Sequence, residues 1–110
     1  MGGFVKGDIV VINFPFSDLS SAKRRPAFVL SSLEGDDIIL CQITTRHNSD
    51  KYAIAIEQGD YDEGELSAKS VVRPNKLFTA DKNLILYAAC KLKKEKVEQV
   101  ISKLTDILNS

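Results

Sequence analysis

The chain has 110 residues, of which 15 are Lys or Arg and 15 are Asp or Glu, so its formal net charge is zero. Hydrophobic residues make up 44% of the sequence and charged residues 27%, which argues against intrinsic disorder and predicts one folded domain over residues 1–110. This balance excludes a histone-like polycation, and no apolar run approaches the ~20 residues of a membrane helix.

The N-terminal residues and the cysteines bear on where the protein works. Residues 1–6 lack the cationic start and long apolar segment of a secretory signal, so we expect a cytoplasmic protein with no membrane partner. Cys41 and Cys90 each lie in an apolar stretch, which favours buried, reduced thiols over a disulfide. Two cysteines and one histidine do not make a zinc site, and we predict no metal and no cofactor.

Strands are predicted along the first half of the chain. Residues 8–14 are β-branched and almost entirely apolar, as in a strand covered on both faces. A loop rich in proline, serine and aspartate follows over residues 15–24. Residues 25–32 and 38–45 are predicted to pair as an antiparallel hairpin, because only a tight turn separates them.

The strand signals are shorter in the second half. A strand is predicted at residues 52–56, followed by a solvated acidic loop over residues 57–65. Residues 70–73 resemble a short strand that Pro74 ends, because proline cannot donate to a central ladder. Weaker strand patterns follow at residues 76–79 and 84–89.

The end of the chain changes its period. Apolar residues recur every three or four positions from Val97 to Leu108, which is the stripe of an amphipathic helix, and the lysines off this stripe predict a solvated face. Lys93 stands where an N-cap such as Ser or Asp is favoured, so the helix must depend on packing. These patterns predict a mainly β fold with one helix: a small, strongly bent, barrel-like antiparallel sheet closed by the C-terminal helix.

Common catalytic motifs are absent from the sequence. It has no dinucleotide-binding glycine pattern, Walker loop, nucleophile elbow or HExxH helix. A single histidine excludes a two-histidine ribonuclease, and the acids of residues 57–65 resemble a loop surface more than ligands of a catalytic metal. What is left is a set of polar and cationic residues at predicted strand ends: Arg24 and Arg25, then Thr44, Thr45, Arg46 and His47, and finally Arg73.

These strand-end residues have two interpretations. Because the start of one hairpin strand lies beside the end of its partner, Arg25 and Thr44 should be close together, and guanidinium and hydroxyl groups can bind a phosphate there. Each residue also fits a simpler role, as a charged strand end, a good strand former or a surface histidine, and Arg73 can pair with the acidic loop. The residues alone leave both alternatives open.

Six short sequence motifs follow one another along the chain in a characteristic order. KGDIV at residues 6–10, FPFSDL at residues 14–19 and KRRPA at residues 23–27 are followed by three weaker blocks: QITT at residues 42–45, SVVR at residues 70–73 and LFT at residues 77–79. With the amphipathic C-terminal helix, this order resembles the PemK/MazF family, the toxins of type II toxin–antitoxin modules, over nearly the whole chain.

The resemblance implies a fold, an activity and partners. It implies an SH3-like barrel, a two-fold homodimer and an RNA groove across that dimer. It also implies metal-independent endoribonuclease activity on single-stranded mRNA, which leaves 2′,3′-cyclic phosphate and 5′-hydroxyl ends and inhibits growth. The implied partner besides RNA is a cognate antitoxin, a small DNA-binding protein whose extended acidic tail occupies the groove.

The resemblance also assigns site residues. Catalytic roles fall on Arg25, Thr44 and Arg73, and RNA-binding roles on Arg24, Thr45, Arg46, His47, Asn75 and Lys76. Arg25 is expected to donate hydrogen bonds, because a guanidinium with a pKa above ~12 is a poor base. The sequence departs from the family at Asn75, where some members carry an aspartate proposed as general base. Either the base is dispensable, or His47 replaces it, or the chain is a weak nuclease.

Two other functions compete with the nuclease. Asn75 also fits a catalytically inactive homologue that binds RNA or an antitoxin. A gyrase poison like the CcdB toxins of the same fold is disfavoured, because those toxins act through C-terminal residues that include a tryptophan, and this chain has no tryptophan.

Overall fold

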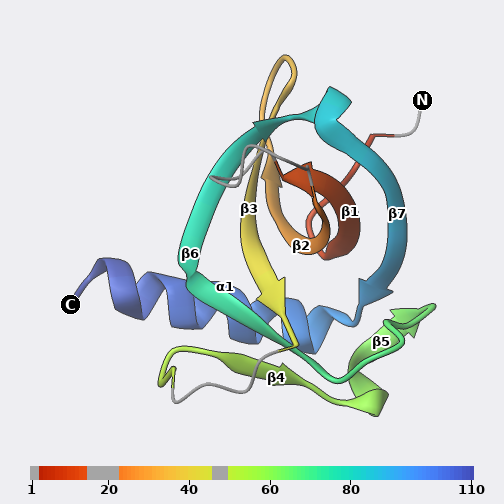
Figure 1. Ribbon diagram of the computed structural model, residues 1–110. Coiled ribbons are helices and arrows are strands. Elements are labelled where there is room, and N and C mark those ends of the chain that lie inside the picture. Colours follow the sequence, from red (N-terminus) through yellow and green to blue (C-terminus); the bar gives the residue numbers. More distant parts are fainter. Residues whose placement is uncertain (1–2, 15–22, 46–49) are drawn as a thin grey trace.

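The computed structural model describes residues 3–14, 23–45 and 50–110. Within these ranges, seven antiparallel strands form one curled sheet, and a C-terminal helix packs against it (Figure 1). The strands and helices are β1 (Asp8–Phe14), β2 (Lys23–Ser32), β3 (Asp37–Thr44), β4 (Ile54–Ile56), η1 (Gln58–Asp60), β5 (Tyr61–Glu63), β6 (Ser70–Asp81), η2 (Lys82–Leu84), β7 (Ile85–Leu92) and α1 (Lys94–Leu108).

The sheet is a curled half-barrel with two open edges. Its strand order is β4-β6-β3-β2-β1-β7-β5, so β4 and β5 are the edge strands. In Figure 1, β6 and β7 arch around β1, β2 and β3, and α1 runs beneath them. The prediction of a mainly β, strongly bent antiparallel sheet with one C-terminal helix is confirmed. None of the helices in the described ranges is long and apolar enough to cross a membrane.

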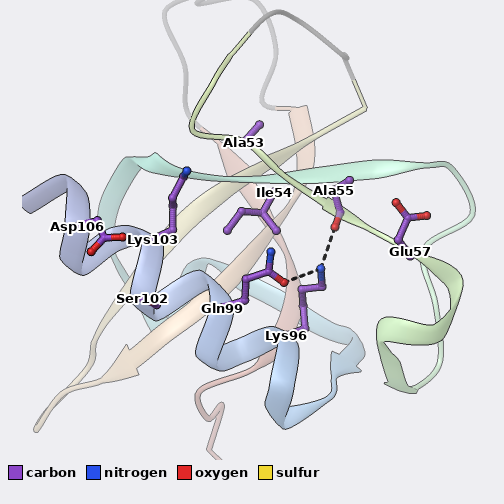
Figure 2. Close-up of a pocket in the computed structure, with 9 residues that line it drawn as sticks. All are labelled: Ala53, Ile54, Ala55, Glu57, Lys96, Gln99, Ser102, Lys103 and Asp106. Atoms are coloured by element: carbon purple, nitrogen blue, oxygen red, sulfur yellow. Dashed lines mark hydrogen bonds between the residues drawn. The ribbon is translucent and has the colours of Figure 1, made fainter.

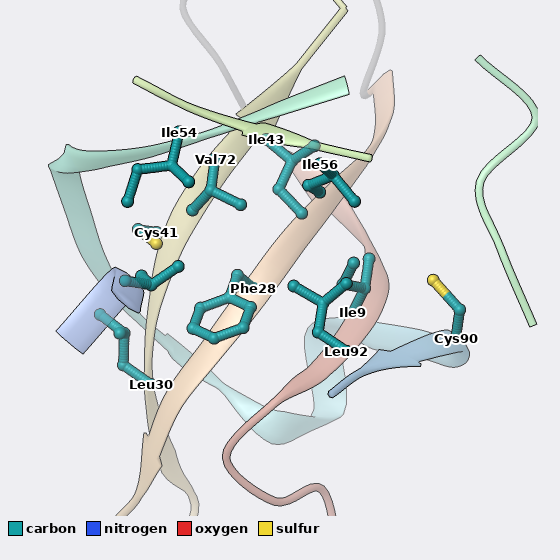
Figure 3. Close-up of a cluster of buried hydrophobic side chains, with 11 residues drawn as sticks. Ile9, Phe28, Leu30, Cys41, Ile43, Ile54, Ile56, Val72, Cys90 and Leu92 are labelled. Carbon is teal, nitrogen blue, oxygen red and sulfur yellow. The ribbon is translucent and has the colours of Figure 1, made fainter. Parts of the chain in front are cut away.

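Both faces of the central strands are buried. Ile9 and Phe28 point into a first cluster, which α1 closes through Val100 (Figure 3). The intervening residues Val10 and Ala27 point into a second cluster on the other face. Because successive side chains of a strand alternate between faces, the almost fully apolar sequence of β1 is explained by this double burial.

The buried thiols are confirmed. Cys41 and Cys90 are both free cysteines, and both side chains belong to the first cluster. Burial raises the pKa of the Cys41 thiol to about 12 and, together with the nearby Asp8 carboxylate, raises the pKa of the Cys90 thiol to about 11.

The strand that Pro74 was expected to end continues through it. β6 runs from Ser70 to Asp81, so the prediction of two separate strands here is wrong. The register with β3 pairs Gln42 with Arg73 and then Cys41 with Leu77, so residues 74–76 form a bulge. Proline is accommodated because a bulged position does not need its N–H for the ladder.

The acidic segment 57–65 is more ordered than predicted. It contains η1 and the short strand β5, and β5 pairs with β7 through Tyr61 and Leu92. Tyr61 also packs against the first cluster. The predicted plain loop is therefore wrong at this segment, because an apolar tyrosine ring and strand pairing outweigh the local charge.

The C-terminal helix lacks an N-cap side chain, as predicted, but one of its lysines, Lys96, is mostly buried and not solvated. α1 starts at Lys94, and the Lys93 side chain makes no capping hydrogen bond. Lys96 was predicted to be solvated, but its side chain is only 10% exposed and its Nζ lies 3.1 Å from Asp60 Oδ2. Lys96 also donates to Ala55 O and Gln99 Oε1, so it links α1 to the edge strand β4 (Figure 2).

Candidate functional site

The three predicted catalytic residues lie on three neighbouring strands, Arg25 on β2, Thr44 on β3 and Arg73 on β6. The register pairs Thr44 of β3 with Val71 of β6, and Gln42 with Arg73. The β2–β3 pairing ends at Ala27 and Gln42, two residues along the strands from Arg25 and Thr44. Because alternate residues of a strand share a face, this places Arg25, Thr44 and Arg73 on one face of three adjacent strands.

Arg73 is held by the carboxylate of Asp50, which no motif in the sequence connects with it. Its Nε donates to Asp50 Oδ2 at 2.9 Å, and the backbone N–H of Tyr52 donates to Asp50 Oδ1 at 2.9 Å. The Arg73 and Asp50 side chains are only 23% and 11% exposed. The expected pairing of Arg73 with the acidic segment 57–65 is therefore not what the structure has.

The surroundings of Asp50 favour its ionised form. The hydrogen bond from the Tyr52 backbone lowers the pKa of the Asp50 carboxyl most, and the side chains of Arg73 and Asn75 lower it further, against the opposing effect of burial. Asp50 is thus a carboxylate at neutral pH and a weak base. Asn75, at the position where the resemblance implied a carboxylate, lies beside this one.

A groove of about 310 Å³ opens beside Arg25, and we refer to it as the Arg25 groove. Its lining residues are Val11, Arg24, Arg25, Pro26, Thr45, Leu66, Ser67, Ala68, Ser70 and Tyr87. The groove brings together three predicted site residues, Arg24, Arg25 and Thr45, all of them exposed. None of the described residues that line it is acidic, so the groove is suited to an anion.

The other predicted site residues lie elsewhere. Thr44 and Arg73 are both outside the lining of the Arg25 groove, and Asn75 and Lys76 are exposed on the β6 bulge. Arg46 and His47 lie outside the described residues, as does most of the predicted loop at residues 15–24. In the described part of the chain, no three His, Cys, Asp or Glu side chains gather where they could hold a metal ion.

Two residues of this region had no signal in the sequence. Asp50 stands in a polar segment with no motif around it, and only the pairing of β4 with β6 brings it to Arg73. Tyr87 lies in an ordinary strand pattern, and only the pairing of β1 with β7 brings it to the Arg25 groove. Both contacts depend on strand partners distant in the sequence.

Comparisons with known proteins agree on one family and one fold. The family model for PemK-like, MazF-like toxins of type II toxin–antitoxin systems matches residues 5–108. MazF from Deinococcus radiodurans has a TM-score of 0.76 at 20% identity, with 100% of both chains covered. A mycobacterial endoribonuclease in complex with its cognate antitoxin has a TM-score of 0.77 at 12% identity, covering 97% of this chain and 96% of that one. No curated protein sequence matched.

Proposed function

Because the chain belongs to the PemK-like, MazF-like toxins of type II toxin–antitoxin systems, we propose that it is an endoribonuclease that cleaves single-stranded RNA and so inhibits growth. The observation that carries this proposal is the Arg25 groove, in which two exposed arginines and a threonine meet without an acidic residue in the described lining. A phosphodiester backbone is the ligand that such a set of donors fits best.

The chemistry follows from the donors available. In metal-independent cleavage, the ribose 2′-oxygen attacks the adjacent phosphorus, its proton passes to a base, and the bond from phosphorus to the 5′-oxygen breaks as that oxygen gains a proton. Negative charge develops on the non-bridging oxygens, which fixed N–H and O–H donors stabilise. We assign this role to the Arg25 guanidinium and the Thr44 hydroxyl, which belong to the adjacent strands β2 and β3.

Arg73 serves as a second cationic donor, oriented by Asp50. The carboxylate engages Nε of a guanidinium that has five N–H donors in a fixed plane, so it sets the direction of the remaining ones. Asp50 itself is a poor candidate for the general base, because its pKa lies below the ordinary range. That role falls to His47 or to solvent.

The proposed partners follow the same family. We propose a homodimer that presents two such sites, and a cognate antitoxin that competes with RNA for the arginines. The mycobacterial neighbour bound to its cognate antitoxin supports this, as that protein has the same fold. A tail rich in carboxylates would meet a groove whose described lining carries two guanidinium groups.

The proposal is tested by mapping RNA ends. The protein is incubated with a long RNA in EDTA, and the products are examined for 2′,3′-cyclic phosphate and 5′-hydroxyl termini. Arg25→Ala should lower kcat by about 10²- to 10³-fold, the usual effect of removing one donor to a developing oxyanion. Lys82→Ala is the control, because Lys82 lies in η2 outside the lining of the Arg25 groove, is exposed, and pairs only with exposed Asp36 among the ion pairs of the described residues.

Asn75 favours a second candidate function, in which the protein binds RNA or an antitoxin without catalysing cleavage. In that case RNA would bind with an affinity that falls steeply with salt, and no cleavage product would form. Full activity of Arg25→Ala would instead show that the site is assigned to the wrong residue.

A further inference from the structure

We propose that Tyr87 is a stacking platform for the nucleobase next to the cleaved phosphate. The proposal rests on the proposed RNA substrate and adds to it a residue that sets where the neighbouring nucleotide lies. Tyr87 is not among the residues that the family resemblance points to.

Strand pairing brings Tyr87 to the arginines. Tyr87 of β7 is the partner of Val11 of β1, and Val11 is in turn the partner of Pro26 of β2. Two strand spacings, roughly 10 Å, therefore separate the backbones of Tyr87 and Pro26. Arg24, two residues before Pro26, shares the face of β2 that Pro26 presents, and Arg24, Arg25 and Tyr87 all line the groove.

The Tyr87 ring serves no evident purpose in the fold. Tyr87 is 51% exposed and belongs to neither buried cluster, whereas Tyr61 packs against the first cluster. Next to it in the groove lie the apolar side chains of Val11, Pro26 and Leu66. An aromatic face with apolar flanks and an open side is what a nucleobase needs to stack.

The charges of the groove favour a nucleotide over other ligands. Arg24 and Arg25 can meet the phosphates while Tyr87 meets the base, and base–aromatic stacking tolerates any sequence because every base has a π-face. The larger groove between β4 and α1, of about 540 Å³, lacks this character (Figure 2). It is lined by charges of both signs, among them Glu57, Lys103 and Asp106.

Binding without cleavage gives the clearest test. Short 2′-O-methyl oligonucleotides of single composition lack the nucleophilic 2′-hydroxyl, so their affinity can be measured on the intact protein by anisotropy. Tyr87→Ala and Tyr87→Leu should weaken binding by about 5- to 150-fold, the range that corresponds to loss of one stacked base. Tyr87→Phe should bind like the parent, because it keeps the ring, and Leu108→Ala on the exposed end of α1 is the control.

A spectroscopic variant adds an independent readout. The sequence has no tryptophan, so Tyr87→Trp introduces a single tryptophan at the proposed platform, which can be excited apart from the remaining tyrosines. Its emission should be quenched by the same oligonucleotides, and an oligonucleotide with an abasic position opposite the ring should quench less. Absence of quenching on a bound oligonucleotide would overturn the proposal.

The outcomes separate this inference from the proposed function. If Tyr87→Leu binds oligonucleotides as well as Tyr87→Phe while Arg25→Ala abolishes cleavage, the nuclease stands and the platform is wrong. If the parent binds through Tyr87 but cleaves no RNA, the platform stands and the nuclease is wrong. If Tyr87→Ala changes the sedimentation coefficient, the ring belongs to a contact between copies of the chain, and the platform is likewise wrong.

Discussion

Arg73 and Asp50 form an ion pair between Nε and Oδ2 at 2.9 Å, although 23 positions separate them in the sequence. The pair ties the segment before β4 to the residue that precedes the β6 bulge. Both side chains are largely shielded from water, so the attraction is screened less than in an exposed pair. The direction of the Arg73 guanidinium is thus set by a residue outside β2, β3 and β6, the three strands that carry the candidate site residues.

Asp50→Asn should weaken the proposed RNA cleavage through Arg73. Without the charge of the carboxylate, the guanidinium is less firmly oriented, and we expect kcat to fall by about 10- to 100-fold with a smaller change in KM. The measurement is steady-state cleavage of a fluorogenic oligonucleotide. Asp36→Asn is the matched control, because Asp36 pairs with Lys82 at 3.4 Å and both side chains are more than half exposed. Equal kcat values for the two variants would contradict the assignment.

The same carboxylate predicts a pH dependence of stability. The pKa of Asp50 in the folded protein lies below its ordinary 3.8 because of the Tyr52 backbone N–H, Arg73 and Asn75. A lowered folded-state pKa contributes stability that is fully present above pH 3.8 and is lost as the pH falls through the folded-state value. Urea unfolding of the parent and Asp50→Asn should therefore differ most at neutral pH and converge in strong acid. A constant difference across this range would show that the charge is not responsible.

The elements that the sequence predicted well are those whose partners are local or whose period is strong. The stripe from Val97 to Leu108 predicts α1, and the tight turn at residues 34–37 predicts the β2–β3 hairpin. The sequence predicts two strands in place of β6, because proline usually ends a strand and Pro74 lies within it. The bulge that accommodates Pro74 exists only through the register with β3, which is not readable from neighbouring residues.

In the candidate site too, contacts between local partners could be predicted and contacts between distant strands could not. The placement of Arg25 and Thr44 on two adjacent strands could be predicted, since it follows from the β2–β3 hairpin alone. The contact of Asp50 with Arg73 and the approach of Tyr87 to the Arg25 groove could not, because each depends on strands that pair across a long stretch of chain. Burial of Lys96 was missed for a related reason: its partners Asp60 and Ala55 come from other elements.

Gly7 is predicted to be required for the contact between β1 and α1. Its φ is +99°, and a Cβ placed there would lie 3.1 Å from Val97 Cγ2. Gly7→Ala should lower the free energy of unfolding by about 1–2 kcal/mol for the backbone conformation, and by more because Val97 must move. Gly35→Ala separates the two effects, since Gly35 also has a positive φ, +82°, but open space around it. Equal losses in urea unfolding would rule out crowding by Val97.

Lys96 is predicted to hold α1 against the edge of the sheet. Its Nζ lies 3.1 Å from Asp60 Oδ2 and 3.2 Å from the backbone oxygen of Ala55 in β4. Lys96→Met keeps the length of the side chain and removes its charge, which leaves the Asp60 carboxylate and the Ala55 carbonyl without this donor and should cost about 1–3 kcal/mol of stability. Hydrogen exchange of β4 amides should accelerate with it, because an edge strand loses its link to the helix. Lys94→Met, at an exposed position of the same helix, should change neither the stability nor the exchange of β4 amides. A similar loss of stability in both variants would mean that the charge of the helix, and not the contact of Lys96 with β4, stabilises the fold.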